Sequence, residues 1–235
     1  MARKVLKGEV TSEPKDTTGA IESIRDLRVA RDSAVKSRTA ALTQLGDLLI
    51  TAPAALRESI NSATNRGKAS QCAKLRPDLA RDYEPLLTAK FALRALARRI
   101  ASFDDEITEL DRHLARLVAD TAPTLISKVG IGTGHAAQLL ITAWQNIDRL
   151  TSEAAFARLC GVAPIPVSSG KTKRMRLHRG GDHQANRALY MIAICRLKYD
   201  PKTITYVERR ISEGLTKRTP PDAANASSPA RYTTT

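Results

Sequence analysis

Two adjacent serines, Ser168 and Ser169, lie in a basic segment of the sequence, where a hydroxyl group could attack a phosphate ester. Between Glu153 and Asp182 there is no acidic residue, while the cations of this interval are Arg158, Lys171, Lys173, Arg174, Arg176 and Arg179. Nearby cations lower the cost of ionising a hydroxyl, and they stabilise the charge that builds up on phosphorus oxygens during attack. The pattern therefore makes Ser169 and Ser168 candidate nucleophiles. The alternative is that Ser-Ser-Gly forms an ordinary turn.

The same basic interval predicts a nucleic-acid contact. A folded segment with this charge repels itself unless a polyanion lies against it, and a sugar-phosphate backbone fits that requirement. We therefore expect DNA to bind here, with a steep dependence on salt, through Lys171, Lys173, Arg174, Arg176 and Arg179.

A second candidate contact is the glycine-rich stretch of residues 125–143. It predicts one helix ending in Val129, a tight turn, and a second helix beginning at about His135, with Val129 and Ile131 pointing inward. The first N–H groups of a helix are a favourable seat for phosphate. The pattern is similar to the helix-hairpin-helix element of non-specific DNA-binding proteins, and its candidate DNA-binding residues are Gly130, Ile131, Gly132 and Gly134. The alternative is an ordinary corner between two helices.

Composition indicates which elements position these residues. The 235 residues carry a formal charge of +14 and a pI near 10.1, which indicates a polyanionic partner. Aromatic residues make up 4% and β-branched runs are scarce, so we expect an all-α chain. There is no long apolar run and no CxxC pair, which predicts a protein of the reducing cytoplasm without a membrane span.

The order of the chain predicts four parts. Residues 1–18 read as the remnant of a preceding domain, 19–122 as a helical coiled-coil arm, 123–214 as a compact helical domain, and 215–235 as a disordered tail. In the arm, a helix over 19–50 has an arginine-rich face that is either solvated or in contact with nucleic acid. A heptad pattern over 86–120 predicts packing against that helix and homo-oligomer formation, through Leu93, Leu96, Ile100, Phe103, Ile107, Leu110, Leu114 and Leu117.

Further helices are expected in the compact domain. Residues 148–161 read as a helix capped by Thr151 or Ser152, and two more helices are expected over 185–198 and 203–214. The intervening residues 162–183 read as irregular. Three other patterns are rejected or explained without function. Gly170-Lys171-Thr172 lacks the glycine that a P-loop needs at position 165, and His178 and His183 lack cysteine partners for zinc. The carboxylates after Phe103 read as a solvated face. No metal ligands are therefore assigned.

Taken together, these motifs resemble a known family. The sequences Val-Gly-Ile-Gly at 129–132, Leu-Cys-Gly-Val-Ala-Pro at 159–164, Ser-Ser-Gly-Lys-Thr-Lys-Arg at 168–174 and Asn-Arg-Ala-Leu-Tyr at 186–190 are similar to the C-terminal transposase domain of bacterial insertion-sequence recombinases. Those recombinases pair a RuvC-like DEDD domain with a serine nucleophile. Residues 19–31 are similar to their helical arm, and the likeness spans about residues 1–200.

The resemblance implies a site-specific DNA recombinase, directed by a structured guide RNA, that assembles as a dimer or tetramer. It implies that Ser169, with Ser168 as the alternative, forms a covalent phosphoserine link to DNA. The family's acidic, Mg²⁺-binding residues lie in an N-terminal domain that would precede Met1. We therefore expect no cofactor in this chain, with Mg²⁺ only in that other domain, and a chain that does not transpose by itself. Two rival hypotheses are a non-catalytic helical DNA- or RNA-binding protein and a purely structural coiled-coil scaffold.

Overall fold

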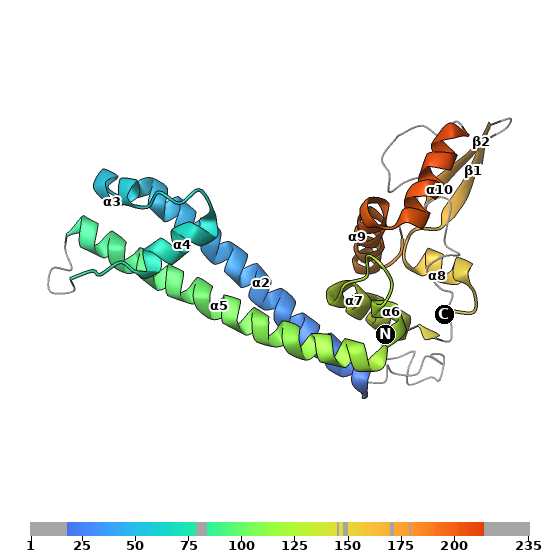
Figure 1. Ribbon diagram of the computed structural model, residues 1–235, viewed down its shortest axis with the longest axis horizontal. Coiled ribbons are helices and arrows are strands. Elements are labelled where there is room, and N and C mark those ends of the chain that lie inside the picture. The colour runs from blue at the N-terminus through green and yellow to red at the C-terminus, as the bar shows by residue number, and fades with distance from the viewer. Residues whose placement is uncertain are drawn as a thin grey trace, which may run out of the picture. The chain divides into compact units, whose positions relative to one another are not determined.

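The computed structural model describes residues 18–78, 84–144, 146–147, 150–169, 172–178 and 180–213; of these, the side chains of 168, 169 and 172–174 are left out. The expected remnant over 1–18, apart from Thr18, and the expected tail over 215–235 lie outside the described residues. The described chain is mostly helical, as predicted, with one two-stranded sheet (Figure 1). It divides into two compact units, one formed by Asp26–Arg116 and the other by the residues on either side.

The arm unit is built on two long antiparallel helices. Helix α2 runs over Ala20–Thr51 and α5 over Pro85–Thr121, which confirms the two predicted helices (Figure 1). Arg31 bonds to Asp111, and Arg38 Nη1 donates to Asp104 Oδ1 at 2.8 Å. Because the partner number falls as the α2 number rises, these ion pairs show that the helices run in opposite directions.

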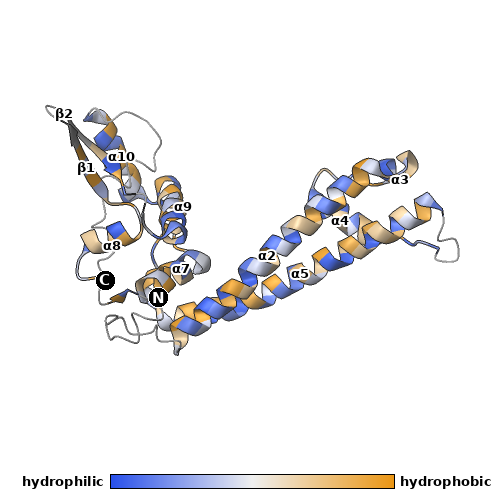
Figure 2. Cartoon of the chain, turned by 180° about the vertical axis from the view of Figure 1, so that it is seen from behind, coloured by the Kyte–Doolittle hydropathy of each residue, from blue (hydrophilic) through white to orange (hydrophobic). Residues whose placement is uncertain are grey.

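The heptad residues of α5 fall into two rows. Leu93, Ile100, Ile107 and Leu114 are buried, whereas Leu96, Phe103, Leu110 and Leu117 are half-buried. Figure 2 shows apolar and polar residues alternating along both long helices. Burial of the first row within one chain confirms the predicted packing against the helix over 19–50. Supercoiling and contact with a second copy stay predictions.

Two short helices close one end of the arm. Helix α3 spans Ala54–Ser59 and α4 spans Asn65–Ala73, where the Thr64 side chain caps α4 by accepting a hydrogen bond of 3.1 Å from the Gly67 N–H. Their apolar residues join those of α2 and α5 in one buried cluster, which includes Leu45, Leu49, Leu56, Cys72, Leu93 and Ile100. The end of the arm is thus a small helical bundle with its own core.

The second unit consists of short helices around a tight helix pair. Its elements are α6 (Pro123–Ile126), α7 (Thr133–Trp144), α8 (Glu153–Leu159), β1 (Pro164–Ser169), β2 (Thr172–Leu177), α9 (His183–Tyr199) and α10 (Pro201–Ser212). Helix α7 packs on α9. Small residues line this contact, and because their side chains are short the two backbones approach closely. The fully buried or nearly buried ones are Ala136, Ala137, Ala185, Ala188 and Ala193.

The predicted irregular segment instead forms a β-hairpin. Strands β1 and β2 pair antiparallel from Pro164 opposite Leu177 to Ser169 opposite Thr172. Prolines at 164 and 166 argue against a central strand, but a two-stranded ribbon has only edges, where proline is tolerated. Val167 is 42% exposed and Met175 67% exposed, so the hairpin does not bury a regular apolar face. Without that face the sequence has no clear period of two for a strand prediction to detect.

The ends of the predicted helices are largely confirmed. Of the two candidate caps of α8, the structure selects Ser152, whose hydroxyl accepts a hydrogen bond of 3.2 Å from the Ala155 N–H. Asp182 caps α9 in the same way. In the described part of the chain, no helix has the length and apolar character needed to cross a membrane.

Candidate functional site

The glycine turn lies between α6 and α7. Helix α6 ends at Ile126 rather than Val129, and α7 begins at Thr133 rather than His135. Ile131 is buried as predicted, but the prediction for Val129 is wrong because its side chain is 46% exposed. Val129 contributes through its backbone instead, since its carbonyl accepts a hydrogen bond of 2.9 Å from Arg196 Nε of α9.

Gly130 is the residue that lets this turn lie against α9. Its φ of +85° is in the left-handed region, and an added Cβ would lie 3.1 Å from the Ile192 carbonyl oxygen. Gly132 differs, because an added Cβ there would meet no atom of the described chain within 4 Å. Gly134, the fourth glycine-turn residue expected to bind DNA, is the second residue of α7. The fold itself therefore accounts for glycine at 130 but not at 132.

The two candidate nucleophiles lie at the end of β1 nearest the hairpin turn. The register places Ser168 opposite Lys173 and Ser169 opposite Thr172, with Arg174 opposite Val167. Serines and basic residues predicted from sequence are thus brought together along one ribbon. Arg176, in β2, is exposed. Gly170, Lys171 and Arg179 lie outside the described residues.

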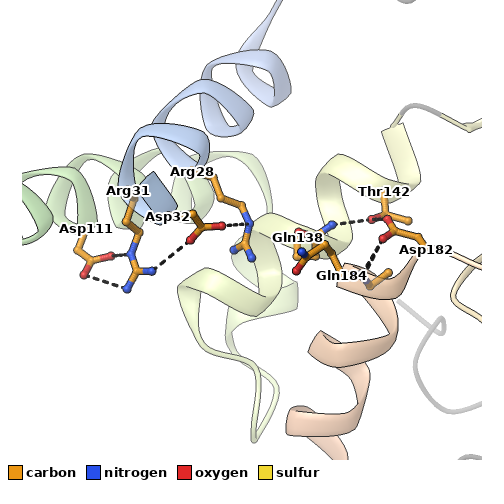
Figure 3. Close-up of polar contacts among 9 residues, drawn as sticks. Arg28, Arg31, Asp32, Asp111, Gln138, Thr142, Asp182 and Gln184 are labelled. Atoms are coloured by element: carbon orange, nitrogen blue, oxygen red, sulfur yellow. Dashed lines mark hydrogen bonds and ion pairs between the residues drawn. The ribbon is translucent and has the colours of Figure 1, made fainter. Parts of the chain in front are cut away.

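A buried polar network holds the end of the hairpin that is joined to the helices (Figure 3). Gln138 Nε2 donates to Thr142 Oγ1 at 3.0 Å, and Thr142 Oγ1 donates to Asp182 Oδ2 at 2.7 Å. The other carboxylate oxygen of Asp182 accepts hydrogen bonds from the N–H groups of Gln184 and Ala185, at 2.8 and 3.2 Å. The network fastens α7 to the first turn of α9, directly after β2.

Close backbone contacts clamp the same end of the hairpin. The Asp182 N–H donates to the Leu159 carbonyl at 2.7 Å, and Asn186 Nδ2 donates to the Cys160 carbonyl at 3.1 Å. A Cβ on Gly181 would lie 2.3 Å from the Gly161 nitrogen, so only glycine fits there. The segments entering β1 and leaving β2 are therefore fixed to each other and to α9. These contacts fix the base of the hairpin, whose first strand contains Ser168 and Ser169.

Other nucleophiles and ligands near the hairpin are less suitable. Burial, reinforced by the Asp182 charge, raises the pKa of the Cys160 thiol to about 12, so it stays protonated at neutral pH. The Nδ1 atom of His178 is buried without a hydrogen-bond partner, in a pocket that Arg158 and Gly180 also line. Among the described residues there is no group of three or more His, Cys, Asp or Glu side chains that could hold a metal ion.

The arginine-rich face of α2, the other basic surface expected from sequence, is engaged within the chain. Arg25 pairs with Glu22, Arg28 with Asp32, Arg31 with Asp111 and Arg38 with Asp104. Ion pairs of this kind neutralise much of the local positive charge. These arginines of α2 are therefore less available to a polyanion than their sequence pattern indicates.

The glycine turn, the clamped hairpin and α9 all lie inside one segment that matches the model of a known family. Residues 122–208 match the family model described as Transposase IS116/IS110/IS902 family. This segment is similar to an insertion-sequence transposase domain. The matched segment includes every site residue predicted from the sequence. It also includes the clamp formed by Thr142, Gly181 and Asp182, which the sequence patterns did not predict. The Gly180-Gly181-Asp182 run before a helix was the available signal for that clamp.

Two relatives encoded by insertion elements match this chain over longer stretches than the family model does. The chain is 26% identical over 177 residues to the IS900 uncharacterized 42 kDa protein of Mycobacterium paratuberculosis, an alignment covering 74% of this chain and 44% of that protein. It is 29% identical over 132 residues to the IS110 uncharacterized 43.6 kDa protein of Streptomyces coelicolor, covering 55% of this chain and 32% of that protein. The chain thus spans less than half the length of these curated relatives.

Proposed function

We propose that this chain acts in DNA transposition as part of a site-specific recombinase, with the β1–β2 hairpin and the glycine turn against DNA. The observation that carries the proposal is that the family match over residues 122–208 includes the whole hairpin and its clamp. The basic hairpin supplies the charge that a phosphate backbone requires. The clamp keeps the serines in a constant position relative to bound DNA, as a nucleophile needs.

In the proposed step, Ser169 Oγ attacks a DNA phosphorus atom. A new bond between Oγ and phosphorus forms while one bridging bond between phosphorus and a deoxyribose oxygen breaks. The serine proton passes to solvent, and the departing sugar oxygen takes up a proton to become a hydroxyl group. The product is a phosphoserine diester, and nothing is oxidised or reduced. Ser168, one position back in β1, is the alternative nucleophile.

The glycine at position 132 gives independent support for a partner at the turn. The chain itself leaves open space where a side chain at 132 would go. A missing Cβ at such a place allows another backbone to approach. A DNA strand lying across the N-terminal turn of α7 would use that space, as the likeness to a helix-hairpin-helix element implies.

The proposed complex has further components. We propose that a RuvC-like acidic domain, which the resemblance to these recombinases implies, supplies the Mg²⁺ site. A structured guide RNA and a second copy of the protein, in contact through residues 86–120, complete the proposed complex. In this proposal the chain binds DNA by itself but transposes only with that domain.

The test is the formation of a covalent protein–DNA adduct. This chain is joined to the remaining segment of the IS900-encoded relative and incubated with the ends of that element, Mg²⁺ and RNA transcribed from the element. We expect a denaturation-resistant adduct that Ser169→Ala abolishes while DNA binding is kept. An adduct that survives Ser169→Ala but not Ser168→Ala moves the nucleophile by one residue. Survival in the double variant refutes serine catalysis and leaves the non-catalytic binding protein as the better reading.

A further inference from the structure

The arm has an uneven charge distribution that its ion pairs explain only in part. Along α5 there is no acidic residue from position 85 to 103, whereas five carboxylates follow between 104 and 116. Because α2 and α5 are antiparallel, the first half of α2 lies beside the acidic half of α5. The basic residues of α2 all precede position 39, and they are Arg25, Arg28, Arg31, Lys36 and Arg38. From position 39 to Thr51 the only charged residue is Asp47.

The basic half of α2 and the acidic half of α5 neutralise each other. Arg31 with Asp111 and Arg38 with Asp104 cross between the two helices, and Arg66 of α4 reaches Asp104 at 3.0 Å. Because opposite charges lie next to each other along the two helices, they favour this alignment of α2 against α5 over others. The half of the arm that contains these pairs therefore has little unbalanced charge.

Among the described residues, the basic half of α5 has no ion-pair partner of this kind. Residues 39–78 and 84–103 together hold nine Lys and Arg side chains and four carboxylates, a net charge of +5. Within the described part of the chain, no ion pair is made by Lys90, Arg98 or Arg99. Arg98 and Arg99 are exposed and Lys90 is half-buried, so all three charges can be reached from solvent.

An exposed aromatic ring lies among these cations. Phe91 is 46% exposed, and the Arg94 guanidinium lies over its ring at 5.9 Å from the centroid. Phe91 and Arg98 are seven residues apart and share a helix face that points away from buried Leu93 and Ile100. Cations next to an accessible aromatic ring are the combination that proteins use to hold nucleic-acid strands.

We propose that the solvent-facing half of α5 binds the sugar-phosphate backbone of a nucleic acid. This half is here called the α5 cationic face; Phe91, Arg94 and Arg98 lie within it, and Lys90 and Arg99 lie at its two edges. From Lys90 to Arg98 the helix rises about 12 Å, which matches the spacing of about three to four phosphates along one strand. Phe91 stacks on an unpaired base. The inference rests on the proposed function only in that its ligand is a nucleic acid; the surface itself lies in a different unit from the hairpin.

The test compares two triple variants of the full chain with the same change in net charge. Lys90→Gln, Arg98→Gln and Arg99→Gln alter the proposed face. The matched control carries Lys36→Gln, Arg112→Gln and Arg116→Gln, three exposed arm residues without an ion pair in the described structure. Circular dichroism checks that both keep their helix content. The probes are a random-sequence DNA duplex, a polythymidine strand and an RNA stem-loop.

The readout is the slope of the logarithm of the binding constant against the logarithm of salt concentration. We expect the first triple variant to flatten the slope by about 2.7 for duplex DNA or about 2 for a single strand, from three lost contacts, with the control unchanged. Phe91→Leu should weaken binding about tenfold for probes with unpaired bases only. The probe most affected by the triple variant distinguishes DNA from RNA as the ligand.

Two results overturn the inference, and they differ in what they say about the proposed function. If the two triple variants have equal slopes while the unchanged chain binds, the α5 cationic face is not a binding surface, although the hairpin proposal stands. If the unchanged chain binds none of the three probes at low salt, both proposals fail. Binding of an acidic polypeptide in preference to all three probes also refutes the nucleic-acid assignment of this face.

Discussion

The Thr142 hydroxyl donates a hydrogen bond of 2.7 Å to the Asp182 carboxylate, across 40 residues of sequence. Thr142 is buried on α7, and Asp182 is the cap of α9. One carboxylate thus does two jobs, because its second oxygen accepts the first N–H groups of α9. Everything between the two residues, including the hairpin with Ser168 and Ser169, is closed into a loop by this contact.

Replacing Thr142 by valine should loosen that closure. Thr142→Val keeps the shape but removes the donor to Asp182 and the acceptor for Gln138, so buried polar atoms lose their partners. We expect a loss of about 1–3 kcal/mol in the free energy of unfolding, measured by urea denaturation. Thr124→Val, at an exposed position of α6, is the control and should change stability little. Equal stability of the two variants would show that the network contributes nothing.

Two glycine substitutions should separate folding from binding. Gly181→Ala places a Cβ 2.3 Å from the Gly161 nitrogen and 2.5 Å from the Leu159 oxygen, both backbone atoms that cannot turn away. We expect a loss of more than about 2 kcal/mol in stability. Gly132→Ala meets no neighbour in the described chain and should leave the melting temperature unchanged, but it should weaken DNA binding. Full DNA affinity in Gly132→Ala would contradict a DNA contact at the turn.

The basic residues of β2 should account for part of the salt dependence of DNA binding. Neutralising Lys173, Arg174 and Arg176 together should lower the slope of log affinity against log salt by about 2.7, equivalent to about three phosphate contacts on duplex DNA. These residues follow each other in one strand of the hairpin. The Lys36, Arg112 and Arg116 triple variant again controls for net charge. An unaltered slope would place the DNA-binding surface elsewhere.

Acid should weaken the arm through Asp104. Burial alone would raise the pKa of Asp104, but hydrogen bonds from Arg38 and Arg66 outweigh it and hold the pKa below its ordinary value. A carboxylate with a lowered folded pKa stabilises the fold above its unfolded pKa of about 4, and this contribution disappears as pH falls through the folded value. We therefore expect Asp104→Asn to cost about 1 kcal/mol at pH 7, and the difference from the unchanged chain to shrink below pH of about 4.

The control for Asp104 is its neighbour Asp105, which is exposed. Asp105→Asn should change the urea midpoint little at either pH. A constant difference between the Asp104→Asn variant and the unchanged chain, from neutral to acidic pH, would show that the effect is not electrostatic.

The half-buried row of α5 gives the predicted self-association a specific test. Phe103 and Leu110 lie seven residues apart, outside the row that packs within the chain. Phe103→Ser with Leu110→Ser should lower the mass measured by sedimentation equilibrium if a second copy packs there, because exposed apolar area drives such contacts. Ala95→Ser with Ala101→Ser, both exposed, is the control. An unchanged mass would mean that the half-buried row of α5 does not contact a second copy.

Much of this protein was determined by local sequence. The two arm helices, the cap at Ser152 and the helix after Asp182 follow from periodicity and capping, because these signals involve residues only a few positions apart. The concentration of basic residues around Ser168 and Ser169 is likewise a property of the chain itself. Such features need no knowledge of what packs against them.

Only the tertiary structure shows which basic residues form ion pairs within the chain and which do not. The arginines of α2 and those of α5 look alike in sequence. Arg31 and Arg38 pair with carboxylates, whereas Arg98 and Arg99 make no ion pair with any residue that the structure describes. The hairpin could not be predicted from the local pattern, because its side chains are exposed and its first strand contains two prolines. The Thr142–Asp182 contact and the close approach at Gly181 hold its two ends together. Contacts between residues 40 or more positions apart depend on the packing of whole helices, which no local pattern records.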